Sequence, residues 1–276
     1  MSPDTLSLAG KVAIITGSGK ENGIGAGIAS ALARNGAAVV INYVSDTSAS
    51  RAAGVAKKIE NAGGRAVVVR ADVSTQEGAK NLVETSLKAL QVDKVDILVN
   101  NAGGGPLIDV MQATGEDVEK TFALNVFASL FMTQAVVPVM PRGGRIINIG
   151  SIASKMGMAP VALYSAAKAA VDTLSYALAM ERQGPFKQVS NFQQLIIPCS
   201  ESCSIHVALT FWGTADGLPP GAVGDAIPKF LVPLTRAEER IGTAEDIGDA
   251  VLLLTSEKSR WITGQYISAS GGITGG

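Results

Sequence analysis

Short apolar runs alternate with helix-like stretches along most of this chain of 276 residues. The runs are rich in β-branched residues and carry few charges, which is typical of strands buried on both faces. We predict strands at residues 11–16, 38–42, 66–69, 96–100 and 145–149, and helices at 26–35, about 47–62, about 75–90 and about 114–139. Strands and helices that alternate at this spacing predict a parallel, doubly wound α/β sheet of the Rossmann type.

The same pattern returns near the C-terminus. Thr243 is predicted to cap a helix that ends near Leu254, because acidic residues follow it in what would be the first turn. Residues 265–268 are the predicted last strand. We find no second domain, repeat or linker, and we predict a single domain over residues 1–276.

Composition excludes several classes of protein. A net charge of −1 and a pI near 5.9 give no electrostatic reason for binding nucleic acid or an anionic membrane. No unbroken apolar run reaches the roughly 18 residues that a membrane span needs, and the N-terminus does not resemble a signal peptide. Two cysteines in a chain of this length indicate a reducing compartment. We therefore expect a cytoplasmic protein.

A glycine-rich turn, T-G-S-G-K-E-N-G-I-G, joins the first predicted strand to the first predicted helix. Glycines let the main chain approach a pyrophosphate, and the free N–H groups of a helix N-terminus favour its negative charge. A turn in this position therefore predicts a dinucleotide site. Its candidate residues are Gly17, Gly23, Ile24 and Gly25.

The end of the second predicted strand bears on which dinucleotide is bound. A carboxylate there would accept hydrogen bonds from the adenosine ribose and repel a 2′-phosphate. The sequence instead runs through Asn42, Tyr43 and Ser45, with no acid before Asp46. Lys20, in the glycine turn, could reach a 2′-phosphate, so we expect NADP or NADPH rather than NAD. The alternative is that Lys20 is a solvated loop charge.

Tyr164 and Lys168 are four residues apart in an Ala-rich helical pattern, so they share one helix face. A lysine ammonium beside a phenol favours the phenolate and lowers the phenol's pKa, which allows proton transfer to a carbonyl oxygen near neutral pH. Ser151, at the end of the fifth strand, could donate a hydrogen bond to the same oxygen. Asn125 lies within an apolar stretch and needs partners, either main-chain groups or a water near the reacting atoms.

In this order, the glycine turn, Asp72-Val73, the N-N-A-G motif, Asn125, Ser151 and Y-x-x-x-K resemble the short-chain dehydrogenase/reductase family. The sequence is most similar to its fungal 3-oxoacyl-carrier-protein-reductase-like and polyketide ketoreductase branch. The resemblance implies one Rossmann-type domain with a mainly parallel, seven-stranded sheet and the cofactor NADPH.

The same resemblance assigns roles to individual residues. Tyr164 is implied as the general acid, Ser151 as the group that orients the carbonyl, and Lys168 as the group that holds the nicotinamide ribose. Asn125 would anchor a water of the proton relay. The remaining implied cofactor contacts are Asp72, Val73, Asn101, Ala102 and Gly103.

Residues 184–212 depart from the family pattern. Glu201 is the only charge between Lys187 and Asp216, and both cysteines and the single histidine lie there. We match the sixth strand to residues 205–213, with Thr214 as the residue nearest the nicotinamide carboxamide; the competing match uses 195–197. Our hypothesis is that much of 188–212 is an insertion, such as a retained intron or a reading-frame error. Because Cys199, Cys203 and His206 lack an evident fourth ligand, we predict no metal site.

We therefore predict an NADPH-dependent reductase that converts a ketone of 3-oxoacyl or aromatic polyketide type to an alcohol. The alternative is an NADP-binding or scaffold protein in which a disrupted substrate lid prevents turnover. The expected partner is a small carbonyl compound, and the resemblance implies a homo-oligomer, either a tetramer or a dimer.

Overall fold

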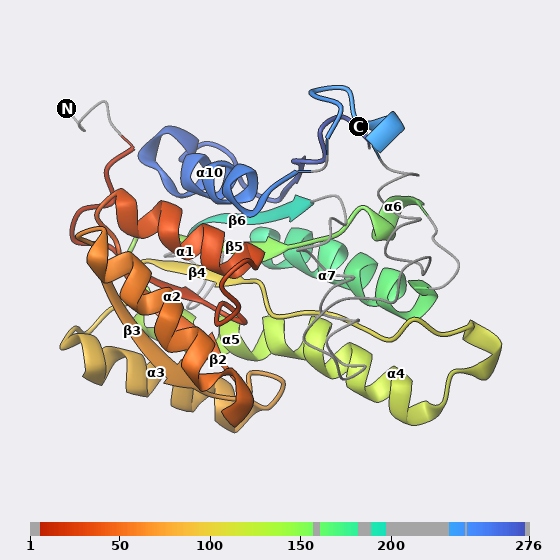
Figure 1. The fold of residues 1–276 in the computed structure, drawn as a ribbon, viewed down its shortest axis with the longest axis horizontal. Coiled ribbons are helices and arrows are strands. Elements are labelled where there is room, and N and C mark those ends of the chain that lie inside the picture. The colour runs from red at the N-terminus through yellow and green to blue at the C-terminus, as the bar shows by residue number, and fades with distance from the viewer. Residues whose placement is uncertain (1–5, 157–160, 182–188, 197–231, 241, 274–276) are drawn as a thin grey trace.

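The computed structural model describes residues 6–156, 161–181, 189–196, 232–240 and 242–273 (Figure 1). The strands form one sheet in the order β3-β2-β1-β4-β5-β6-β7, and each neighbouring pair is parallel. Their bounds are Val12–Ile15, Ala38–Tyr43, Arg65–Arg70, Ile97–Asn100, Gly144–Ile149, Val189–Ile196 and Gln265–Ser268, for β1 to β7 in turn. The predicted parallel α/β fold is confirmed.

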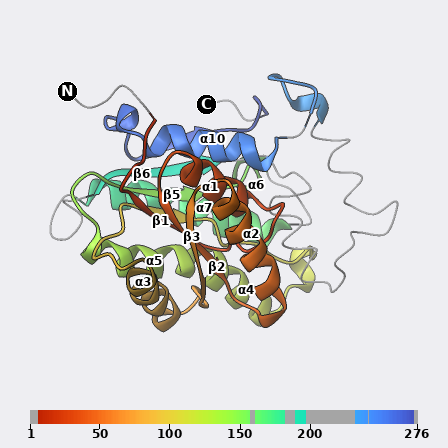
Figure 2. The same ribbon diagram turned by 60° about the vertical axis from the view of Figure 1, so that its left-hand side comes forward.

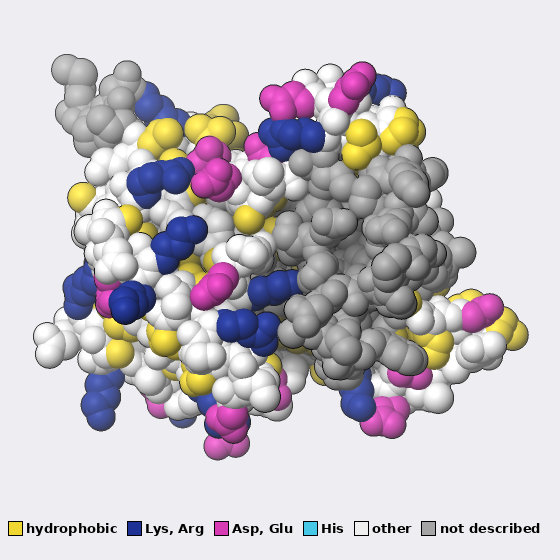
Figure 3. Space-filling view, viewed as in Figure 1, with side chains coloured by type: hydrophobic (Ala, Val, Ile, Leu, Met, Phe, Trp, Pro, Cys, Tyr) yellow, Lys and Arg dark blue, Asp and Glu magenta, His cyan; other side chains and the backbone are white. Residues whose placement is uncertain are grey.

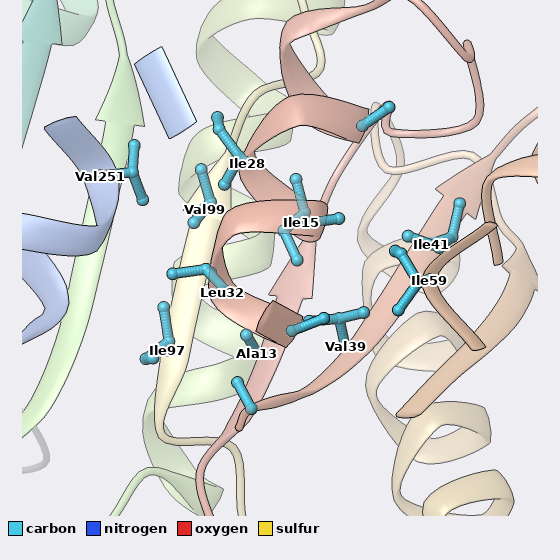
Figure 4. Close-up of a cluster of buried hydrophobic side chains, with 14 of the residues drawn as sticks. Ala13, Ile15, Ile28, Leu32, Val39, Ile41, Ile59, Ile97, Val99 and Val251 are labelled. Atoms are coloured by element: carbon cyan, nitrogen blue, oxygen red, sulfur yellow. The ribbon is translucent and has the colours of Figure 1, made fainter. Parts of the chain in front are cut away.

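Helices cover both faces of the sheet (Figure 2). One buried cluster joins α1, α2 and α10 to the sheet, and a second joins α3, α5 and α7 to the opposite face. These helices are Ile24–Arg34, Ala49–Asn61 and Ala244–Thr255 on the first face, and Gln76–Leu90, Ala128–Val136 and Ala162–Met180 on the second. Figure 4 shows side chains of the first cluster, among them Ile15, Leu32 and Val99, directed into the space between the sheet and its helices.

Local sequence explains where several helices begin. Thr75 caps α3 by accepting a hydrogen bond from the N–H of Gly78. Capping boxes begin α4 (Gly115–Phe122), with Thr114 and Asp117, and α10, with Thr243 and Asp246. Each box satisfies N–H groups that have no partner within the helix. By contrast, α1 begins after Gly23 with no side-chain cap, which leaves main-chain N–H groups at its start for another acceptor.

The sixth strand is not where the preferred sequence match put it. β6 is Val189–Ile196, between β5 and β7, so the match to residues 205–213 was wrong. The competing match at 195–197 shares Leu195 and Ile196 with the end of this strand. Residues 181–188 connect α7 to β6. The first part of the proposed insertion therefore supplies a strand of the sheet; its later residues lie outside the described structure.

The long helix expected at residues 114–139 is divided into α4, a π-helical turn at Ala123–Phe127, α5 and a 3₁₀ turn at Val137–Val139. By length and composition alone, Gly115–Val139 could cross a membrane, as the core helices of many proteins could. Here α5 packs against α3, and both α4 and the π-helical turn pack against α7. Single π-turns within helices occur often at functional sites, and this one contains Asn125.

Candidate active site

Tyr164 and Lys168 lie in the first half of α7, where both are almost completely buried. The Nζ of Lys168 lies 5.7 Å from the centre of the Tyr164 ring, so the predicted shared face is present. Lys168 also donates a hydrogen bond of 2.8 Å to the main-chain oxygen of Ile149 at the end of β5. This bond ties the helix that carries the tyrosine to the sheet edge that leads to Ser151.

Ser151 is fully buried two residues after β5. Its hydroxyl oxygen accepts a hydrogen bond of 3.2 Å from the N–H of Ala153, which leaves its own hydrogen to donate. Ala153 in turn belongs to a buried cluster with Tyr164. Two residues before Ser151, Ile149 accepts the hydrogen bond from Lys168, and two residues after it, Ala153 packs in the cluster of Tyr164. The structure therefore gathers the three predicted catalytic residues in one region.

Asn125 is fully buried, and main-chain groups satisfy its side-chain amide. Its Nδ2 donates to the carbonyl oxygens of Gly104 at 2.6 Å and Thr121 at 2.7 Å, and its Oδ1 accepts from the N–H of Gly104 at 3.0 Å. These bonds support the structural alternative for its amide; the water of the relay remains a prediction. The amide fixes the loop after β4 beside α7.

Close packing around Gly103 explains why the loop after β4 has a glycine at this position. A methyl group on Gly103 would lie 2.8 Å from Oδ1 of Asn125 and 2.9 Å from Nζ of Lys168. Both distances are shorter than side chains tolerate, so only glycine leaves the lysine head group in place. The loop, Asn125 and Lys168 therefore form one packed unit.

The glycine turn is held to the neighbouring strands by polar contacts. Gly17 has a φ of +62° and donates through its N–H to Oδ1 of Asn42 at 3.0 Å. On the other side, Nδ2 of Asn101 donates to the main-chain oxygen of Thr16 at 2.8 Å, and Oγ1 of Thr16 accepts from the N–H groups of Asn101 and Ala102. The predicted residues of the turn and of the N-N-A-G motif thus lie side by side at the carboxyl edge of the sheet.

Gly23, Ile24 and Gly25 form the uncapped start of α1, all of them buried. A methyl group on Gly25 would lie 2.7 Å from Nδ2 of Asn101, so the helix start packs directly on that loop. Close approach of loop and helix N-terminus is the arrangement that binds a pyrophosphate.

Lys20 lies in the same turn with its Nζ buried and without a hydrogen-bond partner among the described residues. Burial lowers the pKa of Lys20, and the nearby Arg51 guanidinium lowers this pKa further. A bound anion would relieve both effects, because it would pair with the ammonium and screen the two positive charges. Figure 3 shows several Lys and Arg side chains on the face that carries α1 and α2.

Other predicted contacts occupy the same edge. Tyr43 ends β2, and its Cβ lies close to Gly19 of the turn. The hydroxyl of Ser45 is 2.9 Å from those of Thr47 and Ser48. Asp72 accepts hydrogen bonds from the N–H and hydroxyl of Ser74, and Val73 is buried in the second core cluster.

Two sequence predictions fall outside the described residues. Thr214 lies in the range 197–231, as do Cys199, Cys203 and His206. Within the part of the chain that the structure describes, no three His, Cys, Asp or Glu side chains come together to hold a metal ion.

Sequence reasoning missed Arg51, Thr16 and the bonding role of Asn42. Arg51 is one of several charges on the exposed face of α2, and nothing in its local pattern distinguishes it. Thr16 and Asn42 could have been suspected, because polar residues at the carboxyl ends of buried parallel strands commonly face a ligand site.

A sequence profile described as short chain dehydrogenase matches residues 11–185. An uncharacterized oxidoreductase of Methylorubrum extorquens is 37% identical, with 96% of this chain and 98% of the relative covered. A hydroxynaphthalene reductase-like protein, Arp2 of Metarhizium acridum, is 34% identical, with 96% of each chain covered. The crystal structure of landomycin C-6 ketoreductase LanV with bound NADP and rabelomycin superposes with a TM-score of 0.80 at 30% identity, with 97% of each chain covered.

Proposed function

The chain belongs to the short-chain dehydrogenase family, and from this membership we propose that it is an NADPH-dependent ketoreductase that acts through Ser151, Tyr164 and Lys168. The observation that carries the proposal is the burial of Tyr164 and Lys168 on one face of α7, with Lys168 bound to the strand end that leads to Ser151. Its relatives include a hydroxynaphthalene reductase-like protein and a ketoreductase solved with NADP.

NADPH is the cofactor, and the residues at the carboxyl edge of the sheet fit it. The uncapped start of α1 and the positive φ of Gly17 suit a pyrophosphate. The buried ammonium of Lys20, which has no hydrogen-bond partner among the described residues, lies near Arg51 and suits a 2′-phosphate, which an acid at the end of β2 would repel. No acid occupies that end, since Tyr43 closes the strand.

The reaction consumes a ketone, NADPH and a proton and yields an alcohol and NADP⁺. Bound NADPH supplies the hydride for the carbonyl carbon. Tyr164 donates its phenolic proton to the carbonyl oxygen, while the Ser151 hydroxyl donates a hydrogen bond that orients this oxygen. Lys168, held by the Ile149 carbonyl, places a positive charge beside the phenol, where it stabilises the phenolate left after proton transfer.

The substrate class is an aromatic polyketide ketone or a 3-oxoacyl compound. The names of the relatives favour the first, since they refer to hydroxynaphthalene and landomycin chemistry. The test is NADPH oxidation by the purified protein with ketones, 1,3-diketones, hydroxynaphthoquinones and a 3-oxoacyl thioester, with each alcohol identified by mass. If none of these carbonyl compounds supports NADPH oxidation, the proposal is contradicted.

We also propose that the protein is a homo-oligomer. Phe127, Tyr176 and Met180 are exposed, at 44%, 56% and 49%, on helices that pack against each other. Large apolar side chains that are exposed on neighbouring elements favour association with a second copy. Light scattering after size-exclusion chromatography would give the mass, and a monomer at micromolar concentration would contradict this proposal.

A further inference from the structure

Asp172 is an acid buried within the catalytic helix. It lies one helical turn after Lys168 and two turns after Tyr164, so all three share one face of α7. Its side chain is 10% exposed, and Oδ1 has no hydrogen-bond partner among the described residues. Its Oδ2 lies 2.9 Å from the hydroxyl of Ser154 and 3.2 Å from Nζ of Lys155. Burying an ionised carboxylate with one oxygen unsatisfied costs free energy, and protonation reduces this cost.

Ser154 connects this acid to the loop that holds Ser151. Its Oγ lies 2.8 Å from the main-chain oxygen of Ser151 and 2.9 Å from Oδ2 of Asp172. A serine hydroxyl has one hydrogen, so it cannot make a full hydrogen bond to two acceptors at once. When Asp172 is ionised, its carboxylate and the Ser151 carbonyl compete for the single hydroxyl hydrogen of Ser154. When Asp172 is protonated, it donates to Ser154, and Ser154 donates to Ser151 without competition.

Burial and the neighbouring groups act on the protonation of Asp172 in opposite directions. Burial raises the pKa of Asp172, while the Ser154 hydroxyl and the ammonium groups of Lys155 and Lys168 act in the opposite direction. Lys155 comes from α6 (Ala153–Met156), and its ammonium lies 4.2 Å from the centre of the Tyr266 ring on β7. These are the titratable groups that face Asp172 from the described elements packed around it.

We propose that Asp172 is a positioning residue for Ser151 and that it acts through the hydroxyl of Ser154. The chain Asp172–Ser154–Ser151 joins α7, which carries the general acid, to the loop that presents the serine hydroxyl. In the protonated state of Asp172 this chain holds the Ser151 carbonyl, and ionisation weakens that hold. The proposal rests on the proposed ketoreductase function, because the position of Ser151 matters to that reaction.

The test is a double-mutant cycle with Ser154→Ala, Asp172→Ala and the double variant, measured as kcat and as KM for NADPH. Because small displacements of a catalytic group cost much of the rate, each single variant should lose about tenfold in kcat at low pH, where Asp172 is protonated and the chain is intact. The double variant should lose no more than either single one, since all three break the same chain. KM for NADPH should stay within about twofold of wild type, because the chain does not touch the cofactor site.

Asp172→Asn supplies the measurement that a merely structural role would not change. The asparagine amide donates to Ser154 at every pH, as the protonated acid does. The kcat of the variant relative to wild type should therefore be near one at low pH, where both side chains donate, and should rise about threefold as the pH increases and wild-type Asp172 ionises. Thr173→Ala, an exposed neighbour on the same helix, is the matched control and should follow wild type at every pH.

Additive losses in the cycle, or a kcat ratio for Asp172→Asn that does not change with pH, would overturn the proposal. Wild-type turnover is measured first, so that failure of the ketoreductase function is seen separately. If wild type reduces no carbonyl compound, the same cycle is measured as free energy of unfolding. Additivity there would overturn the hydrogen-bonded chain itself, whereas non-additive losses would support it.

Discussion

The Nζ of Lys168 and the main-chain oxygen of Ile149 form a hydrogen bond of 2.8 Å across the junction of α7 and β5. This bond fixes a lysine from a helix at the end of a central strand, one residue before the Gly150-Ser151 loop begins. The lysine is also confined by Gly103, since any larger residue there would meet its ammonium. The face of α7 that carries Lys168 is thus placed by contacts from two different strand ends.

Tyr164→Phe should lower kcat by about a hundredfold or more, as loss of a positioned general acid does. NADPH affinity should be nearly unchanged, because the aromatic ring remains. Stopped-flow measurement of carbonyl reduction and fluorescence titration of NADPH separate the two effects. Tyr176→Phe, an exposed tyrosine on the same helix, is the control. A Tyr164→Phe variant with near-normal turnover would refute the mechanism.

Lys20→Ala and Arg51→Ala should each raise KM for NADPH about tenfold, the effect of one lost hydrogen bond to a charged group. KM for NADH should change little, because NADH lacks the 2′-phosphate. Lys57→Ala, an exposed lysine on α2, is the control. Equal losses of affinity for both cofactors would show that these side chains do not recognise the 2′-phosphate.

Gly103→Ala should reduce kcat about tenfold while leaving the fold intact, because a small displacement of a catalytic group is enough to cost rate. The added methyl would lie 2.9 Å from Nζ of Lys168 and 2.8 Å from Oδ1 of Asn125, so both side chains must move. Steady-state kinetics and far-UV circular dichroism would test this. Gly115→Ala, where the methyl meets nothing within 4 Å, should behave as wild type. Unaltered kcat in Gly103→Ala would argue that the lysine head group tolerates displacement.

Asp246→Asn should destabilise the protein by about 1 kcal/mol at pH 7, as loss of a capping-box carboxylate does. Hydrogen bonds from Arg240, and then from Thr243, lower the pKa of Asp246 below its ordinary value of 3.8. A lowered folded-state pKa contributes stability above the unfolded-state pKa, and this contribution is lost as the pH falls through the folded-state value. The difference from wild type in urea unfolding should therefore shrink below about pH 4. Asp249→Asn on the same helix is the control, and a difference independent of pH would contradict the assignment.

The sequence determined the order of strands and helices because most of these elements carry a local signal, either an apolar run or a capping residue. Apolar β-branched runs marked β1 to β5, and Thr114 and Thr243 marked helix starts through their own acidic neighbours. The four-residue interval of Tyr164 and Lys168 fixed a shared helix face before any packing was known. These properties depend on residues that are close in the chain.

Other features depended on contacts between distant residues, which local patterns do not record. β6 carries Ser, Asn and Gln among its residues and lacks a buried-strand pattern, so only its pairing with β5 and β7 identified it. The π-turn contains Asn125, and the partner of its amide, the Gly104 main chain, lies in the distant loop after β4. Likewise, only the packing of α2 on the glycine turn brought Arg51 near Lys20, and only the meeting of α6 with α7 brought Ser154 to Asp172. The tertiary structure decided these relationships because burial and charge act through space, whatever the separation along the chain.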